Sequence, residues 1–291
     1  MARRMTEMTD NERIYKCEER YNKFLASCVS AISSDLSVQL LLVAGPSCSG
    51  KTTTTSKLIE GLAKSGRNAF MISVDDFYKK AADMPKKPDG QPDFEALESF
   101  DLDTLHKCLS RLVNGEAASI PRFDFQKSKR YDNDRTISLG ENGIAVVEGL
   151  HALNPVLYEN YVDSSKVYRV FLDCHTDTMS SMRYSRFMRR LVRDYHYRNS
   201  DAEKTFYLWE NVLEGEKKYI YPFEKYADVK INTRFDYEPN VFRNSVLDIL
   251  SKLPEKSKYA PSAKEIIDYL SVLEPIDEKL VPQDSLLREF L

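Results

Sequence analysis

The stretch "LLVAGPSCSGKTTTT", from Leu41 to Thr55, decides the fold of this chain. An apolar run ends in a loop of small residues, and Lys51 with four threonines then opens a run of helical character. The loop "GPSCSGKT" (45–52) matches G-x-x-x-x-G-K-[ST] in full. It lies between a predicted strand and a predicted helix, which is the context that a phosphate-binding loop requires. We call residues 45–52 the phosphate loop.

The phosphate loop predicts a nucleoside triphosphate, ATP, as ligand. Glycines let the backbone wrap an anion with its N–H groups inward, and the N-terminus of the next helix adds positive partial charge. We expect Lys51 to reach the outer phosphates and the Thr52 hydroxyl to ligate Mg²⁺. The alternative, a Gly/Ser turn that matches by chance, is disfavoured by the flanking pattern. The residues expected to bind ATP are Gly45, Ser47, Cys48, Ser49, Gly50, Lys51, Thr52 and Thr53.

Composition limits the classes of function. The 291 residues are 42% hydrophobic and 30% charged, as in soluble globular proteins. A net charge of −3 argues against polyanion binding by bulk charge, so any anion site is local. Five scattered cysteines without a Cys-x-x-Cys pair favour reduced thiols and a cytoplasmic location. The sequence shows no histidine spacing typical of a metal site, no signal peptide and no apolar run long enough for a membrane span.

Short apolar runs alternate with helical patterns along most of the chain. The runs at 38–44, 68–74, 143–149, 167–173 and 227–232 suit strands that are buried on both faces. Helical patterns separate them at 53–66, 101–115 and 176–194. This alternation predicts an α/β fold of the P-loop NTPase type, with three α/β/α layers and a mainly parallel sheet. We expect residues 117–139 to add a small β-hairpin.

We expect one kinase-type domain, residues 38–253, with an extension at each end. We expect residues 1–37 to form an N-terminal helical extension, whose helix spans about Asn11–Ile32 with one shared face of Tyr15, Phe24, Leu25, Cys28 and Ile32. Residues 254–291, here called the tail, are expected to pack back on the domain as a helix. The pattern "SAKE" (262–265) predicts a capping box before that helix.

Acidic residues follow two of the predicted strands. Asp75 and Asp76 come after the strand 68–74, and Glu148 ends the strand 143–149. Ligands of open α/β sheets bind at the carboxyl ends of strands, so these carboxylates should face the phosphate loop. One can hold Mg²⁺ and another can accept a proton from an attacking hydroxyl. Asp76 can equally be a loop acid or a helix cap.

Several motifs together resemble the uridine kinases of the phosphoribulokinase/uridine kinase family. They are "GPSCSGKTT", "ISVDDFYK", "PDFEALESFD", "IPRFDF", "VVEGLHAL", "RRLVRD" and "KYADV", in the family's order, over residues 39–253. The closest resemblance is to a bacterial branch whose members often follow an extra N-terminal domain; this chain is a stand-alone form or part of a longer protein. The resemblance implies ATP-dependent phosphorylation of a nucleoside and a possible homo-oligomer.

The resemblance also assigns roles to single residues. Asp75 matches the carboxylate that takes the proton from the nucleoside 5′-hydroxyl. Thr52, Asp75 and Glu148 match the magnesium environment. The substrate positions are Tyr78 near the nucleoside, Glu95 at the ribose hydroxyls, and Phe123 and Ser128 where uridine kinases carry a tyrosine and a histidine that read the base. Leu208 and Ser200 also replace polar family residues. Lost hydrogen-bonding groups imply a different base or weaker base selection.

Arginines are dense between residues 183 and 198. Arg183, Arg186, Arg190 and Arg193 are spaced to line one helix face, and Arg189 and Arg198 add to the cluster. "RRLVRD" resembles the family's lid, so we expect a lid at about 183–205. Arg190 and Arg193 would act in transfer, and Arg198 would bind ATP. The alternatives are a solvated basic face or surface pairing with Glu203, Glu214 and Glu216, or a nucleic-acid surface with interleaved aromatic residues. The latter is disfavoured because such aromatic residues usually pack.

The sequence therefore predicts ATP-dependent phosphoryl transfer to a small-molecule hydroxyl, most plausibly the 5′-hydroxyl of a nucleoside. A second reading is a kinase for another acceptor, such as a sugar phosphate or a pantothenate-like acid, with Arg122, Lys127, Lys129 and Arg130 as anion ligands. A third is a P-loop regulatory protein that binds ATP without an acceptor. Asp75 speaks against the third reading, because a pure binder needs no base.

Overall fold

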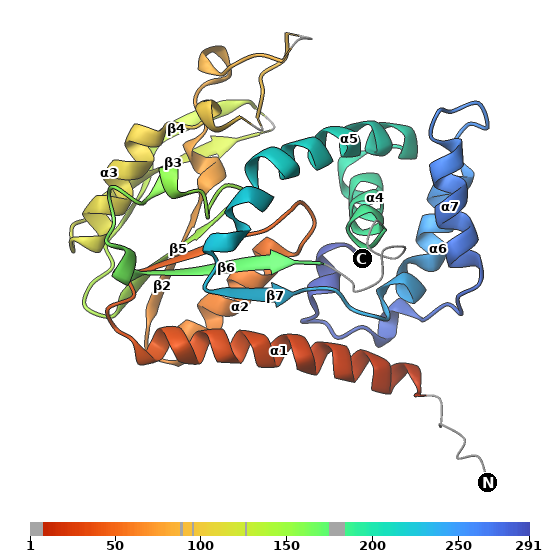
Figure 1. The fold of residues 1–291 in the computed structure, drawn as a ribbon, viewed down its shortest axis with the longest axis horizontal. Helices are drawn as coiled ribbons and strands as arrows, with labels where there is room; N and C mark the ends of the chain where they lie inside the picture. Colours follow the sequence, from red (N-terminus) through yellow and green to blue (C-terminus); the bar gives the residue numbers. More distant parts are fainter. Residues whose placement is uncertain (1–7, 88–89, 95, 126, 175–183) are drawn as a thin grey trace.

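The computed structural model describes residues 8–87, 90–94, 96–125, 127–174 and 184–291. At its centre is a sheet of five parallel strands in the order β2-β5-β1-β6-β7 (Figure 1). Their bounds are β1 Leu40–Ala44, β2 Asn68–Ser73, β5 Gly143–Glu148, β6 Val167–Asp173 and β7 Val229–Asn232. The predicted parallel sheet is confirmed, and each strand lies within its predicted run.

Helices cover both faces of this sheet. They are α1 Asp10–Ser34, α2 Lys51–Lys64, α3 Leu102–Val113, α4 Ser185–Arg198, α5 Ala202–Tyr219, α6 Glu238–Ser251 and α7 Ala260–Ser271. Successive β1 side chains point to opposite faces. Leu41 and Val43 join the core under α1, α2 and α6, whereas Leu40 and Leu42 join the core under α3 (Figure 1). The three-layer P-loop fold is thus confirmed.

The sheet register brings the sites predicted from sequence to one edge. Val43 of β1 and Ser73 of β2 both pair with Glu148 at the end of β5. The three strands therefore end in line, because parallel strands point in the same direction. The loop after β1 and the residues after β2 consequently meet beside Glu148.

The N-terminal helix α1 begins with a capping box, in which Thr9 and Glu12 bond reciprocally. Its buried face runs through Ile14, Tyr21, Leu25, Cys28 and Ile32. The expected helix is confirmed, but Tyr15 and Phe24 are 65% and 39% exposed, so their predicted packing is wrong. The reason is the helical period: each lies one position away from the stripe that starts at Ile14.

The predicted hairpin is present as β3 (Ala118–Asp124) and β4 (Lys129–Ile137), which pair antiparallel. It forms a sheet of its own beside the 3-10 turn Val74–Phe77 that follows β2. Figure 1 shows the hairpin next to α3, away from α1. It therefore borders the edge at which the strands of the main sheet end.

The tail contains α7, which begins at Ala260. The predicted capping box at 262–265 is wrong, because Ser262 lies inside the helix and the N-cap Tyr259 makes no side-chain cap bond. Pro261 in the first turn explains the earlier start, since proline is favoured there. Beyond α7, the side chains of Leu286, Leu287 and Phe290 are fully buried in the core that contains α1 and α2.

All five cysteines are buried and unpaired. Within the described ranges, helices of sufficient length are too polar to cross a membrane.

Candidate active site

The phosphate loop joins β1 to α2, and its backbone explains its glycines. Gly50 is left-handed with φ +82°, and a Cβ there would lie 2.4 Å from Cδ1 of Leu286. A Cβ on Gly45 would lie 2.5 Å from the Leu172 carbonyl oxygen. Gly50 is also the N-cap of α2 and gives it no side-chain cap. The first N–H groups of α2 are therefore free of such a cap and suited to bind an anion.

Lys51 is folded back on the phosphate loop. Its Nζ donates to the carbonyl oxygens of Gly45 and Pro46, both at 3.0 Å. Burial lowers the pKa of Lys51, and nearby acids including Glu148, Glu216 and Asp75 oppose that shift. An ammonium held by carbonyl oxygens at the loop is placed to exchange them for phosphate oxygens.

The two acids at the strand ends share a cavity with the phosphate loop. It measures about 700 Å³ and is lined by Lys51, Thr52, Asp75 and Glu148, among other residues. Glu148 also accepts a hydrogen bond from the Ser73 hydroxyl at 3.1 Å, which fixes its side chain across β2 and β5. The sequence prediction that these acids converge on the loop thus agrees with the geometry.

Asp76 faces away from this cavity. Its carboxylate accepts from the backbone N–H of Phe123 at 3.4 Å and from Arg135 at 3.3 Å. Burial raises the pKa of Asp76, and these two interactions oppose the shift. Of the two readings left open for Asp76, the loop acid is the better fit, because it ties the 3-10 turn to the hairpin.

The residues at the strand ends suit Mg²⁺. The Thr52 hydroxyl and the carboxylates of Asp75 and Glu148 line one cavity, and all supply oxygen. Mg²⁺ prefers oxygen ligands and usually takes only one or two carboxylates, with phosphates and water completing its shell. Among the described residues, histidines, cysteines and acids form no closed cluster of three or more. The donor set therefore fits an ion held jointly with a triphosphate.

An aromatic wall forms part of the cavity lining. Tyr78, Phe94 and Phe125 border it. The Tyr78 hydroxyl donates to the Phe94 carbonyl at 2.6 Å, and the Tyr78 ring stacks on Phe100 at 4.2 Å between centroids. Phe125 is 54% exposed and lies edge-on to Tyr78. Such rings can hold a planar ligand by stacking.

The other expected substrate residues lie elsewhere. Phe123 is buried and packs edge-on to Tyr78 without lining the cavity. Ser128 is exposed in the turn between β3 and β4, with φ +46°, and is also absent from the lining. The structure therefore does not bring Phe123 or Ser128 to the cavity lining, whereas Phe125, which follows the end of β3, lies in it. Glu95 lies outside the described residues.

Three arginines of α4 reach the cavity together. Arg190, Arg193 and Arg198 line it and surround the buried Asp194, at 3.0, 3.5 and 3.4 Å. Burial, followed by the charge of Arg193, lowers the pKa of Arg198. One carboxylate shared by three guanidinium groups leaves net positive charge facing the cavity. These are the arginines that the sequence favoured, whereas Arg183 lies outside the described residues.

The remaining arginines of α4 have different partners. Arg189 is fully buried and bonds to Glu238 and to the carbonyl oxygens of Cys48 and Thr233. Arg186 forms a bidentate ion pair with Glu216 of α5, with Nη1–Oε1 and Nη2–Oε2 distances of 2.7 and 2.9 Å. Both arginines support the phosphate loop from outside the cavity.

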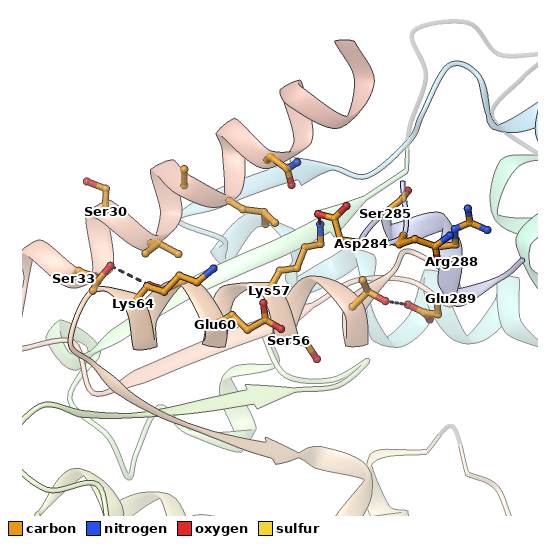
Figure 2. Close-up of a pocket in the computed structure, with 18 of the residues that line it drawn as sticks. Ser30, Ser33, Ser56, Lys57, Glu60, Lys64, Asp284, Ser285, Arg288 and Glu289 are labelled. Carbon is orange, nitrogen blue, oxygen red and sulfur yellow. Dashed lines mark hydrogen bonds and ion pairs between the residues drawn. The ribbon is translucent and has the colours of Figure 1, made fainter. Parts of the chain in front are cut away.

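Two acids bonded to the phosphate loop and to the first turn of α2 were not predicted as part of the site. Glu216 accepts from the Ser47 N–H at 2.9 Å, and Glu289 of the tail accepts from the Thr53 hydroxyl at 2.7 Å. Both line the cavity. Figure 2 shows the tail, including Glu289, lying beside α2. Their partners are 169 and 236 residues away in the chain, and no local pattern signals such contacts.

The basic residues considered for an anionic acceptor do not line the cavity. Arg130 bonds to Asp101 at 2.8 Å and to the Tyr78 carbonyl at 3.2 Å. Arg122 bonds to Asp134 at 3.1 Å and stacks on Tyr131. These guanidinium groups are engaged by acids of the hairpin and of the N-cap of α3.

Comparison with known proteins places this geometry in context. The model of the "Phosphoribulokinase / Uridine kinase family" matches residues 40–236. A curated uridine kinase from Deinococcus deserti is 30% identical over 190 residues, 65% of this chain and 84% of that protein. One from Staphylococcus haemolyticus is 28% identical over the same shares of the two chains.

A solved structure shares the fold. It is titled a possible uridine kinase from Bacillus stearothermophilus and superposes with a TM-score of 0.50 at 21% identity. The match covers 75% of this chain and 100% of that chain. Residues beyond 236, including α6, α7 and the end of the tail, lie outside the family match.

Proposed function

Since the chain belongs to the phosphoribulokinase/uridine kinase family and is an ATP-dependent small-molecule kinase, we propose that its acceptor is the 5′-hydroxyl of a nucleoside. One observation carries this proposal. A carboxylate, Asp75, and an aromatic wall line the same cavity as the phosphate loop. A base for a hydroxyl and a platform for a planar ring are what a nucleoside acceptor requires.

The donor's phosphates bind to the phosphate loop and α2. Lys51 exchanges its carbonyl partners for the outer phosphate oxygens, and the loop N–H groups hold the phosphate between them. Thr52, Asp75 and Glu148 would hold Mg²⁺, which neutralises phosphate charge when bound. Arg190, Arg193 and Arg198 add positive charge on the other side and exclude water, which limits hydrolysis.

The acceptor enters between the aromatic wall and the strand ends. Tyr78, Phe94 and Phe125 stack against the base and point the sugar toward Asp75. Asp75 orients the 5′-hydroxyl toward the outer phosphate and takes its proton as the new oxygen–phosphorus bond forms and the bond from that phosphorus to the ADP oxygen breaks, so that ADP leaves. Phe123 and Ser128 do not offer polar groups to the base here, so we propose that the wall binds by stacking and selects bases weakly.

The other two readings receive less support. An anionic acceptor needs basic groups beyond those that would hold the triphosphate, and the four candidates for that role, Arg122, Lys127, Lys129 and Arg130, do not line the cavity. A regulatory protein without an acceptor needs no carboxylate beside the phosphates, yet Asp75 lines the cavity. The neutral nucleoside remains the acceptor that fits both observations.

A pair of neighbouring variants tests the role of Asp75. In Asp75→Asn, ATP binding should persist while the rate of phosphoryl transfer falls at least ~10²-fold, because the base is lost. Asp76→Asn is the matched control: it removes an adjacent acid that faces the hairpin, so transfer should stay close to that of the wild type. ADP release measures the rate of transfer, and direct titration measures ATP binding. A normal transfer rate in Asp75→Asn would refute the assignment of Asp75 as the base.

A further inference from the structure

Ser47, the third residue of the phosphate loop, is bonded through each of its polar groups to α4 and α5. Its N–H donates to Oε1 of Glu216 at 2.9 Å, and its carbonyl oxygen accepts from Nη1 of Arg186 at 3.0 Å. Its hydroxyl accepts from Arg190 at 3.2 Å. The orientation of the Ser47 backbone is thus set by residues that lie outside the phosphate-binding motif.

The Arg186–Glu216 pair is built rigidly. The two bonds of 2.7 and 2.9 Å form a fork, and the guanidinium also lies over the Trp209 ring at 5.2 Å and donates to the Tyr221 hydroxyl at 3.3 Å. The exposed fractions of the two side chains are 12% and 2%. A buried bidentate ion pair restricts the orientation of both side chains more strongly than an ion pair on the surface does.

The loop depends on this support because its own bonds are few. Within it, the Ser49 N–H donates to the Pro46 carbonyl, and Lys51 binds carbonyl oxygens that a triphosphate would release. Cys48 is held at φ +60°, a conformation that non-glycine residues rarely adopt. A loop that is ordered before its ligand arrives loses less conformational entropy on binding.

We propose that Arg186 and Glu216 are positioning residues, which hold the Ser47 peptide in the shape that receives the triphosphate and couple that shape to α4 and α5. The inference rests on the proposed function, because it takes ATP as the ligand of the loop. It adds to the lid arginines a pair that acts on the Ser47 peptide. Glu216 acts through the Ser47 N–H, and Arg186 acts through the Ser47 carbonyl and through Glu216.

A double variant tests whether the Arg186–Glu216 pair positions the phosphate loop or only fills space. In the double variant R186M/E216L, apolar side chains of similar bulk replace the pair, a change that often leaves stability unaltered or higher. The thermal midpoint should stay near that of the wild type, while the dissociation constant of Mg·ATP, titrated without acceptor, rises at least ~10-fold. The matched control is R169M/D228N, which breaks an ion pair at the opposite end of β6 and should leave ATP binding unchanged.

A conservative variant covers the case in which the double variant does not fold. In R186K the charge remains, but a single ammonium replaces the fork that binds Glu216 and the Ser47 carbonyl together. Its dissociation constant for Mg·ATP should also rise. Wild-type affinity in a folded R186M/E216L or R186K protein would overturn the inference alone. Failure of the wild type to bind Mg·ATP would overturn the proposed function, and this inference with it.

Discussion

Replacing Glu289 by glutamine should strengthen ATP binding. The Glu289 carboxylate accepts from the Thr53 hydroxyl at 2.7 Å, in the first turn of α2 (Figure 2). The first backbone N–H groups of a helix lack intrahelical partners, so a phosphate bound at Thr53 would lie beside this carboxylate. Glutamine keeps the shape and an acceptor oxygen for Thr53 but removes the negative charge. The substitution therefore isolates the repulsion between the tail and the donor.

The size of the effect follows from the charges. Two unit charges about 6 Å apart repel by about 3 kcal/mol at an effective dielectric constant of 20. Glu289 is partly exposed, and salt screens its charge, so about 1–2 kcal/mol should remain. This corresponds to a decrease of roughly 5- to 30-fold in the dissociation constant of Mg·ATP.

Calorimetric titration of Mg·ATP measures this difference directly, at low and at high salt. The gain in E289Q should shrink as salt rises, and adenosine, which has no phosphate, should bind both proteins alike. Glu278→Gln, an exposed acid elsewhere in the tail, is the matched control and should bind ATP like the wild type. If E289Q bound ATP as the wild type does, or more weakly, the Glu289 carboxylate would not repel the bound phosphates, which contradicts the prediction.

Three further outcomes are expected. Lys51→Ala should abolish ATP turnover, because no other ammonium among the described cavity residues can replace it; more than about a tenth of wild-type ADP release would contradict its role. Leu286→Ala should lower the free energy of unfolding, measured in urea, by about 2–5 kcal/mol, because it removes a fully buried side chain that lies beside Gly50. A decrease below about 1 kcal/mol would show that the tail is not part of the core. Burial acts to raise the pKa of Asp101, but hydrogen bonds from Thr104 and the charge of Arg130 outweigh it, and the pKa is lowered. A carboxyl group whose pKa is lowered in the folded protein stabilises the fold fully above its unfolded pKa, about 4, and this effect is lost as the pH falls toward the lower folded pKa. The stability advantage over Asp101→Asn should therefore shrink as the pH falls below about 4, and a constant difference from pH 7 to pH 3 would contradict this.

Much of the fold follows from local sequence. Strands buried on both faces give continuous apolar runs, and the runs at 38–44 and 143–149 contain β1 and β5. The phosphate loop is equally local, because its geometry depends on glycines at fixed spacing. The buried face of a helix is harder to predict. Tyr15 was expected on the packed face, but it lies one position away from that face and is exposed.

Only the site residues that directly follow the strands of the parallel sheet could be predicted from the sequence. Asp75 and Glu148 converge because parallel strands finish at one edge. The aromatic wall was partly missed, since Phe125 lies in an irregular turn whose direction no pattern gives. Glu216 and Glu289 are long-range partners of the loop, and their role depends on packing of α5 and of the tail, which a single sequence does not encode locally.

ADP release from Mg·ATP in the presence of single acceptors is the direct test of a nucleoside 5′-hydroxyl as the acceptor. The panel comprises purine and pyrimidine nucleosides, their 5′-deoxy analogues, a few sugar phosphates and pantothenate. We expect stimulation by one or more nucleosides, none by the analogues that lack the 5′-hydroxyl, and a 5′-monophosphate as product. Stimulation only by an anionic acceptor, or tight ATP binding with no stimulation by any nucleoside, would contradict this expectation.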